Sequence, residues 1–147
     1  MRVVIQRVKQ ASVAVGLVVK GQVGKGLLIF VAIAKQDTVA DAEYLAEKIV
    51  ELRVFEDQQG KMNLSIGEVN GELLVVSQFT LLANCVKGRR PSFDAAADPT
   101  TAENLYERFI EVLKAKEIKV ETGEFRAMME VSLINDGPVT FILDSDK

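Results

Sequence analysis

The sequence predicts an α/β fold in which helices pack on one face of a curved, mixed but mostly antiparallel β-sheet that is partly barrel-like. Three observations support this prediction. Short apolar stretches separated by glycines fill the first 33 residues, two later segments repeat apolar residues at helical spacing, and apolar runs rich in β-forming residues follow each of them. Because 147 residues is close to the usual size of one domain, we expect a single domain over residues 1–147.

The N-terminal third predicts a β-meander followed by a helix. The first strands are expected in "RVVIQRV", "ASVAVGLVV" and "GLLIFVAIA", which are alternating or continuously apolar and are separated by glycines typical of tight turns. A helix is expected to begin at Thr38, because Asp41 follows three residues later as a capping partner. Its apolar face consists of residues at helical spacing: Ala42, Leu45, Ala46, Ile49 and Val50.

The rest of the chain predicts a central strand, a second helix and closing strands. After a short apolar piece with a polar turn, "RVFEDQQGKMN", a buried strand is expected in "ELLVVSQFTLL". The second helix is expected to begin after Asp98, a favoured capping residue, with Pro99 at the first helical position. Its apolar face is formed by Leu105, Tyr106, Phe109, Val112 and Leu113, and the closing strands are expected in "IKVETG", "AMMEVSLI" and "PVTFILD".

The amino-acid composition limits the catalytic and metal-binding chemistry that this chain can perform. The chain has no histidine and a single cysteine, Cys85. Ser-His-Asp and Cys-His catalytic systems therefore cannot be assembled, and neither can a zinc site of the Cys/His type. Any enzyme built from this chain must move protons with a group other than imidazole, and we expect no metal and no cofactor.

The sequence also predicts where the protein resides. Its start, "MRVVIQRVKQASVAV", alternates apolar and polar residues and lacks the unbroken apolar stretch of a signal peptide. No apolar run approaches the about 20 residues that a membrane crossing requires. We therefore expect a soluble, cytoplasmic protein without a membrane partner.

Polar residues emerge where the predicted central strand ends. Ser77, Gln78 and Thr80 are well placed there to line a pocket, although they can equally satisfy backbone groups as the chain turns. Thr80 could act as a nucleophile only with a lysine or carboxylate as its base. Successive backbone N–H groups at a strand end can instead stabilise an oxyanion without any titratable side chain.

A basic loop follows this strand. Lys87, Arg89 and Arg90 lie close to Gly88 and Pro91, which is the pattern of a solvated turn or of a loop that contacts phosphates. Three cations suffice for a short stretch of backbone, such as the end of an RNA. The net charge of −3 argues against extensive non-specific binding of nucleic acid, and we expect no DNA partner.

The segment "NDGPVT" at residues 135–140 interrupts an apolar β-forming run with Gly137 and Pro138. Asn-Asp-Gly-Pro is a strong turn sequence, so a plain hairpin between two strands explains it most simply. The alternative is a Gly-Pro peptide whose carbonyl groups point the same way, which a cis bond allows. Only about 5% of X-Pro bonds are cis, so this frequency alone favours the hairpin.

Three further residues are candidates for supporting a site. Arg7 lies in an apolar strand pattern, and a buried arginine needs carbonyl or carboxylate acceptors. Phe125 and Met129, in "TGEFRAMMEV", could form a binding wall, although such a group more often fills a core.

Taken together, several motifs resemble one family. "QRVKQASV", "GKMNLS", "VVSQFTLLA", "GRRPSF" and "TGEFRAMMEVSLINDGPVTF" occur in this order, and the chain is similar to the D-aminoacyl-tRNA deacylases of bacteria and eukaryotes nearly from end to end. Ala32 stands where many members are expected to have glycine, and "LLANCVKG" is less typical, so the resemblance says less about the loop that meets RNA.

The resemblance implies a homodimer that hydrolyses the ester between a D-amino acid and tRNA, and that also acts on glycyl-tRNA mischarged on tRNA(Ala). It implies an active site at the subunit interface. Gly137 and Pro138 match a cis dipeptide inserted into the partner's pocket, Arg7 matches a residue that steadies it, and residues 77–80 (Ser77, Gln78, Phe79, Thr80) match the pocket floor and oxyanion donors. Catalysis is expected to use the tRNA's own terminal 2′-hydroxyl. Two alternatives remain: a non-catalytic dimeric module that binds RNA ends, and an acyl-ester hydrolase with Thr80 as nucleophile.

Overall fold

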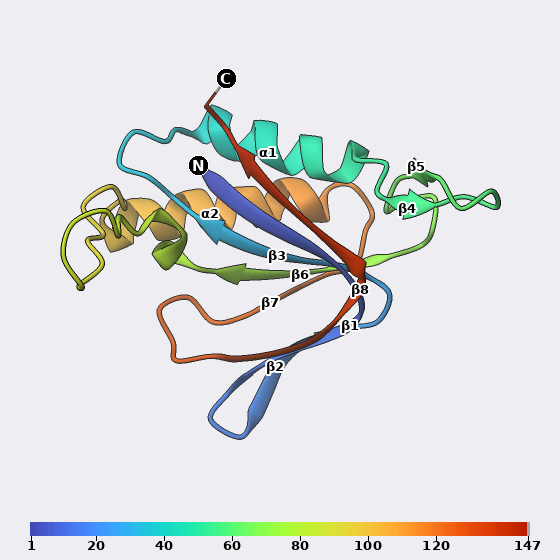
Figure 1. The fold of residues 1–147 in the computed structure, drawn as a ribbon, viewed down its shortest axis with the longest axis horizontal. Coiled ribbons are helices and arrows are strands. Elements are labelled where there is room, and N and C mark those ends of the chain that lie inside the picture. Colours follow the sequence, from blue (N-terminus) through green and yellow to red (C-terminus); the bar gives the residue numbers. More distant parts are fainter. Residues whose placement is uncertain (147) are drawn as a thin grey trace.

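A six-stranded sheet organises the computed structural model, which describes residues 1–146 (Figure 1). Residue 147, which the predicted domain includes, lies outside the described part. The strands of this sheet are β1 (Arg2–Val15), β2 (Val18–Val23), β3 (Gly26–Ala32), β6 (Glu72–Ser77), β7 (Val120–Thr122) and β8 (Glu130–Asp144). The remaining elements are a small hairpin of β4 (Phe55–Glu56) and β5 (Met62–Leu64), a 3-10 helix η1 (Phe79–Leu82), and the helices α1 (Val39–Glu51) and α2 (Pro99–Lys114).

Strand β1 is the centre of the sheet. On one edge it pairs antiparallel with β3 over residues 2–8 and with β2 over residues 11–15, and on the other edge it pairs antiparallel with β8 along most of its length. Strands β6 and β7 extend the sheet beyond β3 in parallel orientation. The predicted meander is therefore wrong in one respect, because β2 and β3 both pair with β1 and lie along the same edge of it.

The sheet curls until its ends nearly meet. A Cβ atom added to Gly21 of β2 would lie 2.9 Å from the carbonyl oxygen of Thr122 in β7, so only glycine allows this approach. Both helices cover one face of the sheet (Figure 1). Large side chains between helices and sheet, such as Ile5, Ile29, Ile49 and Phe109, form the main core, and a smaller apolar cluster occupies the other side. The predicted fold class is confirmed.

Both predicted helix starts are confirmed by their capping contacts. The Thr38 backbone N–H and hydroxyl donate to Asp41 Oδ2 at 2.7 and 2.8 Å, and the backbone N–H of Thr101 donates to Asp98 Oδ1 at 3.0 Å. These hydrogen bonds stabilise the ionised carboxylates, so the pKa values of Asp41 and Asp98 lie below their usual range. Local chemistry thus determines where each helix begins.

Two predicted strands differ from the structure. The run "ELLVVSQFTLL" is a strand only as far as Ser77, and residues 79–82 form η1, because the polar residues after Val76 end the buried strand. The two last predicted strands are one strand, since β8 continues from Glu130 to Asp144 and both halves pair with β1. The hairpin interpretation of "NDGPVT" is therefore wrong.

Within residues 1–146, no helix combines the length and the hydrophobicity that a membrane crossing needs.

Candidate functional site

Strand β8 carries a large bulge opposite a single residue of β1. Gln6 pairs with Thr140 and Val8 pairs with Asn135, so residues 136–139 of β8 face Arg7 alone. A bulge frees backbone groups from the ladder, which explains how a long strand can contain Pro138 without losing a required hydrogen bond. The side-chain amide of Asn135 closes the bulge by donating to the carbonyl oxygens of Arg7 and Val139, each at 3.0 Å.

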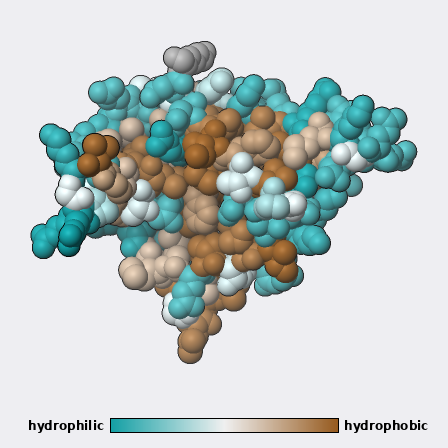
Figure 2. All heavy atoms as spheres, viewed as in Figure 1, coloured by the Kyte–Doolittle hydropathy of each residue, from teal (hydrophilic) through white to brown (hydrophobic). Residues whose placement is uncertain are grey.

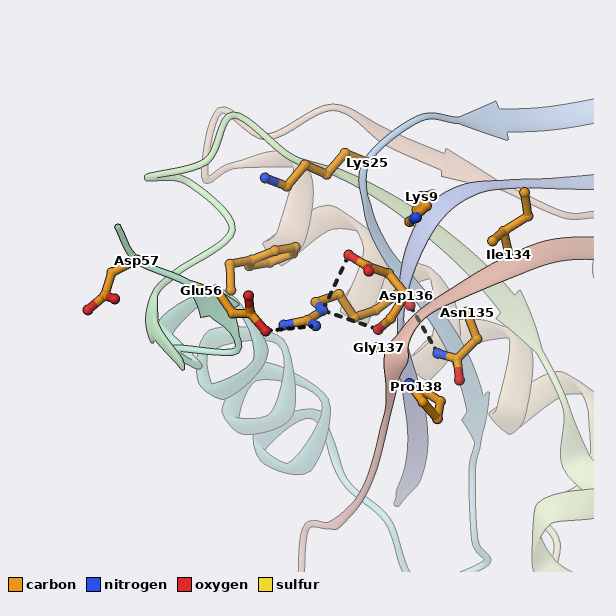
Figure 3. Close-up of a pocket in the computed structure, with 11 residues that line it drawn as sticks. Lys9, Lys25, Glu56, Asp57, Ile134, Asn135, Asp136, Gly137 and Pro138 are labelled. Carbon is orange, nitrogen blue, oxygen red and sulfur yellow. Dashed lines mark hydrogen bonds and ion pairs between the residues drawn. The ribbon is translucent and has the colours of Figure 1, made fainter. Parts of the chain in front are cut away.

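The buried guanidinium group of Arg7 contacts the bulge from the interior of the protein. The residue is only 5% exposed, and its Nε donates to the carbonyl oxygen of Asp136 at 3.2 Å. Its Nη1 donates to the carbonyl oxygen of Val54 at 2.7 Å, and carboxylate oxygens of Asp136 and Glu56 lie 3.5 and 3.7 Å from its nitrogens (Figure 3). A buried cation is stable here because carbonyl and carboxylate groups replace its hydration.

The Gly137-Pro138 dipeptide forms the outer part of the bulge. Both residues are exposed, and the peptide bond between them is cis, as the resemblance implies. Gly137 has φ of +129°, a conformation that L side chains rarely adopt. A Cβ atom there would lie 2.6 Å from Cγ2 of Val139 and 3.1 Å from Nη2 of Arg7, so both backbone conformation and space require glycine.

A hollow of about 760 Å³ lies beside the bulge (Figure 3). Arg7 and residues 134–138 form one wall, and residues 55–57 form another. Backbone N–H groups of Lys61 and Gln59 donate to Asp57, which lowers the pKa of this carboxyl group and keeps it ionised at neutral pH. The hollow therefore contains both cations and carboxylates and has no marked preference for an anionic ligand.

A second group of candidate residues lies at the end of β6. The backbone N–H of Gln78 donates to Val31 at 2.7 Å, after which the chain turns into η1. The first N–H groups of a helix, here those of Phe79 and Thr80, have no partner within the helix. The side-chain amide of Gln78 donates to Thr80 Oγ1. The Phe79 ring is 53% exposed and meets Phe93 edge-to-face at a centroid distance of 5.1 Å.

No base for a nucleophilic Thr80 is found among the described residues. The hydroxyl oxygen accepts from a neutral amide, and neither a lysine nor a carboxylate is recorded in contact with it. Two backbone donors that have no partner within η1, beside an ordered hydroxyl, are better suited to binding a carbonyl oxygen than to attacking one.

The loop between β7 and β8 reaches the same end of the sheet. Val75, two residues before Ser77, accepts a hydrogen bond from the Gly123 backbone N–H at 3.1 Å. Phe125 packs on Tyr106 of α2 at a ring centroid distance of 5.7 Å, and Met129 packs against the smaller core cluster. Burial also raises the pKa of Tyr106, whose hydroxyl donates to Val75. Phe125 and Met129 thus fix this loop beside the end of β6.

The predicted basic loop is also beside η1. Backbone hydrogen bonds between Asn84 and Ser92, at 2.8 and 3.0 Å, close it into a hairpin-like turn. Lys87, Arg89 and Arg90 are all exposed on this turn, without a recorded carboxylate partner in residues 1–146. The loop presents unneutralised positive charge next to the candidate oxyanion donors.

The two groups of candidate residues are far apart within one chain. Arg7, opposite the bulge, pairs with Leu27 of β3, which pairs with Leu73 of β6, and Ser77 lies four residues further along β6. Four residues along a sheet and three strand spacings across it place the dipeptide about 20 Å from Ser77. Figure 1 agrees, since β6 points to the left of the view and β8 bends on the right. One chain therefore cannot bring the dipeptide to its own η1.

Some residues of the site were not predicted from the sequence. Asn135 closes the bulge and Glu56 accompanies Arg7, but the pairing of β1 with β8 and the approach of β4 only become visible in three dimensions. Phe93 packs against Phe79, and the only indication of this residue in the sequence was its place in the "GRRPSF" motif. Within the described part, no group of three or more histidine, cysteine or acidic side chains is placed to hold a metal ion.

Comparison with known proteins identifies the family to which the sequence motifs point. A family model described as D-Tyr-tRNA(Tyr) deacylase matches residues 4–144. The chain belongs to this family. The resemblance predicted from the sequence motifs is thereby confirmed for nearly the whole chain.

Relatives match this member of the D-Tyr-tRNA(Tyr) deacylase family over nearly their full length. A protein of Thermotoga petrophila named D-aminoacyl-tRNA deacylase is 56% identical over 147 residues, which is 100% of this chain and 99% of the relative. A protein of the same name from Halothermothrix orenii is 58% identical with the same coverage.

Two solved structures are similar to this family member. One, described as "c-Myc DNA Unwinding Element Binding Protein", has a TM-score of 0.92 at 41% identity and covers 100% of both chains. Another, described as "a probable eukaryotic D-amino acid tRNA deacylase", has a TM-score of 0.83 at 20% identity, covers 97% of this chain and 98% of its own, and supports the fold.

We predict that Gly137→Ala lowers the free energy of unfolding by about 1–3 kcal/mol, because alanine is strained at the observed φ and its Cβ has no room. Urea unfolding measures this change. Gly67→Ala is the matched control, since nothing lies within 4 Å of a Cβ there, and it should change stability by no more than about 0.5 kcal/mol. Equal stability of the two variants would contradict the prediction.

Proposed function

We propose that this protein hydrolyses the ester bond of D-aminoacyl-tRNA and releases the D-amino acid and free tRNA. Family membership over residues 4–144 and full-length relatives named D-aminoacyl-tRNA deacylase support this function. The structural observation that carries it is the exposed Gly137-Pro138 dipeptide, which Arg7 and Asn135 hold in one conformation outside the strand ladder.

The proposed active site is shared between two copies of the chain. In this proposal one site uses both the dipeptide and η1, and it takes them from different protomers because they lie about 20 Å apart within one chain. Strand β8 has only β1 as a partner in residues 1–146, so its other edge is open. Ile134 and Ile142 of β8 are 48% and 65% exposed, and apolar side chains gather on this face of the molecule (Figure 2). An apolar face next to an open strand edge is suited to a homodimer.

The proposed reaction is direct hydrolysis. Water adds to the ester carbonyl, the bond to the 3′-oxygen of the terminal adenosine breaks, and that oxygen takes up a proton as the amino acid leaves. The Phe79 and Thr80 N–H groups donate to the developing oxyanion, a contribution of about 3 kcal/mol for a single such donor. In this proposal the neighbouring 2′-hydroxyl of the tRNA relays the proton, as the family resemblance implies, which agrees with the absence of histidine from the chain.

The same geometry accounts for chiral proofreading. In this proposal the carbonyl oxygens of the partner's dipeptide hold the substrate amino group while η1 holds the ester carbonyl. With the amino group and the ester carbonyl fixed, the side chain on the α-carbon has one orientation open to it. An L-amino acid has the opposite configuration at the α-carbon, so its side chain collides with the dipeptide wall. Rejection by collision makes the site broad among D-amino acids. It also leaves glycine unrejected, which extends the proposed activity to glycyl-tRNA mischarged on tRNA(Ala).

The basic loop is proposed to hold the acceptor end of the tRNA. Lys87, Arg89 and Arg90 supply charge where the ester must enter, and arginine matches phosphate geometry well. The same loop and the exposed Phe79 would also suit a non-catalytic module that binds RNA ends. The name of one solved relative refers to DNA, but the net charge of −3 and the single short basic loop do not favour duplex binding here.

We predict that the wild-type protein releases tyrosine from D-tyrosyl-tRNA at least about a hundredfold faster than from L-tyrosyl-tRNA, a difference of about 2.7 kcal/mol in transition-state binding. Release of free amino acid is measured for both isomers under identical conditions. Equal rates would exclude the steric mechanism, and absence of release from either isomer would favour the binding module.

Thr80→Ala should retain at least about a tenth of wild-type turnover, because the hydroxyl only accepts a hydrogen bond from Gln78. Thr80→Ser, which keeps a hydroxyl, is the control. Complete loss in the alanine variant with full activity in the serine variant would support a covalent threonine nucleophile instead.

A D-aminoacyl-tRNA that ends in 2′-deoxyadenosine should be cleaved at least about a hundredfold more slowly, since it lacks the hydroxyl that relays the proton. Single-turnover cleavage of matched substrates with and without this hydroxyl provides the measurement. Normal cleavage of the deoxy substrate would show that another group carries the proton.

A further inference from the structure

Arg126 occupies an unusual backbone position next to the proposed active site. It has φ of +66°, a left-handed conformation in which an arginine is disfavoured and a glycine is not. The chain thus has an arginine at a position where glycine would give a more stable backbone. Such a position often reflects a functional requirement for the side chain.

The loop that carries Arg126 is fixed on both sides of it. Before Arg126, the Gly123 backbone N–H donates to Val75 and the Phe125 ring packs on Tyr106. After Arg126, Met129 packs so closely over Gly123 that a Cβ atom there would lie 2.6 Å from its sulfur. These contacts fix the backbone of Arg126 near the end of β6.

The side chain of Arg126 is exposed and its charge is not neutralised. Arg2, Arg7 and Arg108 each lie within 4 Å of a carboxylate, whereas no such partner of Arg126 is recorded in the part of the chain that the structure describes. In Figure 1 the β7–β8 loop and the basic loop of residues 84–92 lie at the end of the molecule towards which β6 points. Unpaired cations are thus present on two loops near η1.

We propose that Arg126 is a positioning residue that binds a backbone phosphate of the single-stranded RNA end carrying the ester. Its planar guanidinium donates two parallel hydrogen bonds to the phosphate, while the basic loop holds the same strand at another point. This contact fixes the depth to which the terminal nucleotide enters, and it takes no part in the bond-breaking step. The inference rests on the proposed deacylase function.

Arg126→Gly separates binding from folding, because it removes the charge and relieves the backbone. Its stability in urea should equal or exceed that of the wild type. With D-tyrosyl-tRNA its KM should rise at least about tenfold at unchanged kcat, as expected for the loss of one charged contact with a phosphate. The slope of log KM against log salt concentration should fall by about 0.7, the value for one phosphate contact on a single strand.

Three control variants isolate the cause. Arg126→Lys keeps a cation and should keep the wild-type salt slope. Lys61→Gln removes a positive charge from the β4–β5 turn and should leave KM unchanged. Glu117, at φ of +60°, has the same type of backbone, so Glu117→Gly should show the backbone relief without the change in KM.

A substrate without phosphate provides the decisive comparison. D-tyrosyl-adenosine should be hydrolysed equally by wild type and Arg126→Gly. An equal defect of the variant on this substrate and on D-tyrosyl-tRNA would overturn the proposal, as would an unchanged KM and salt slope on the tRNA. Binding of uncharged tRNA, measured for both proteins, tests Arg126 independently of catalysis. If the wild type cleaves neither ester, the deacylase function fails, whereas a weaker variant–tRNA complex still supports the contact.

Discussion

The geometry of the proposed site depends on the buried guanidinium group of Arg7. It links three segments that are distant in the sequence: β1, the bulge of β8 and the chain just before β4. Removing one partner from a buried charged group typically costs about 3–5 kcal/mol, because the remaining polar groups lose both water and partner. Through the carbonyl oxygens of Asp136 and Val54, Arg7 thus holds the bulge against β1 and against the chain before β4, and these contacts fix the position of Gly137-Pro138.

In the proposed site, backbone groups of the bulge and of η1 take the roles that catalytic side chains usually have. The bulge leaves the backbone of residues 136–139 outside the β1–β8 ladder, and the first N–H groups of η1 have no partner within that 3-10 helix. Backbone groups held by an ordered sheet need no reorganisation when charge develops, which is the condition for electrostatic catalysis by position. A chain without histidine can therefore support ester hydrolysis, provided that the substrate supplies the proton relay.

Much of the fold could be predicted from the sequence because its signals are local. The capping pairs Thr38–Asp41 and Asp98–Thr101 form within one helical turn, so sequence spacing suffices to place both helix starts. Pairing of β1 with β8 joins residues that are 116 to 142 positions apart, and no local pattern encodes it. The hairpin interpretation of "NDGPVT" failed for this reason: a turn sequence and a bulge in a long strand look alike until the partner strand is known. The site residues at 77–80 and 137–138 came from the family resemblance, since each motif alone had a simpler structural explanation.

The central claim is that each active site combines the dipeptide of one protomer with η1 of another. Mixing two impaired variants tests it directly: Gly137→Ala disrupts the dipeptide, and Phe79→Pro removes one oxyanion donor at a first helical position, where proline is tolerated. Random exchange of subunits makes half of the dimers mixed, and each mixed dimer has one intact site, so the mixture should recover about a quarter of wild-type deacylation. Activity that stays at the level of the separate variants, under conditions where subunit exchange is demonstrated, would contradict the shared site.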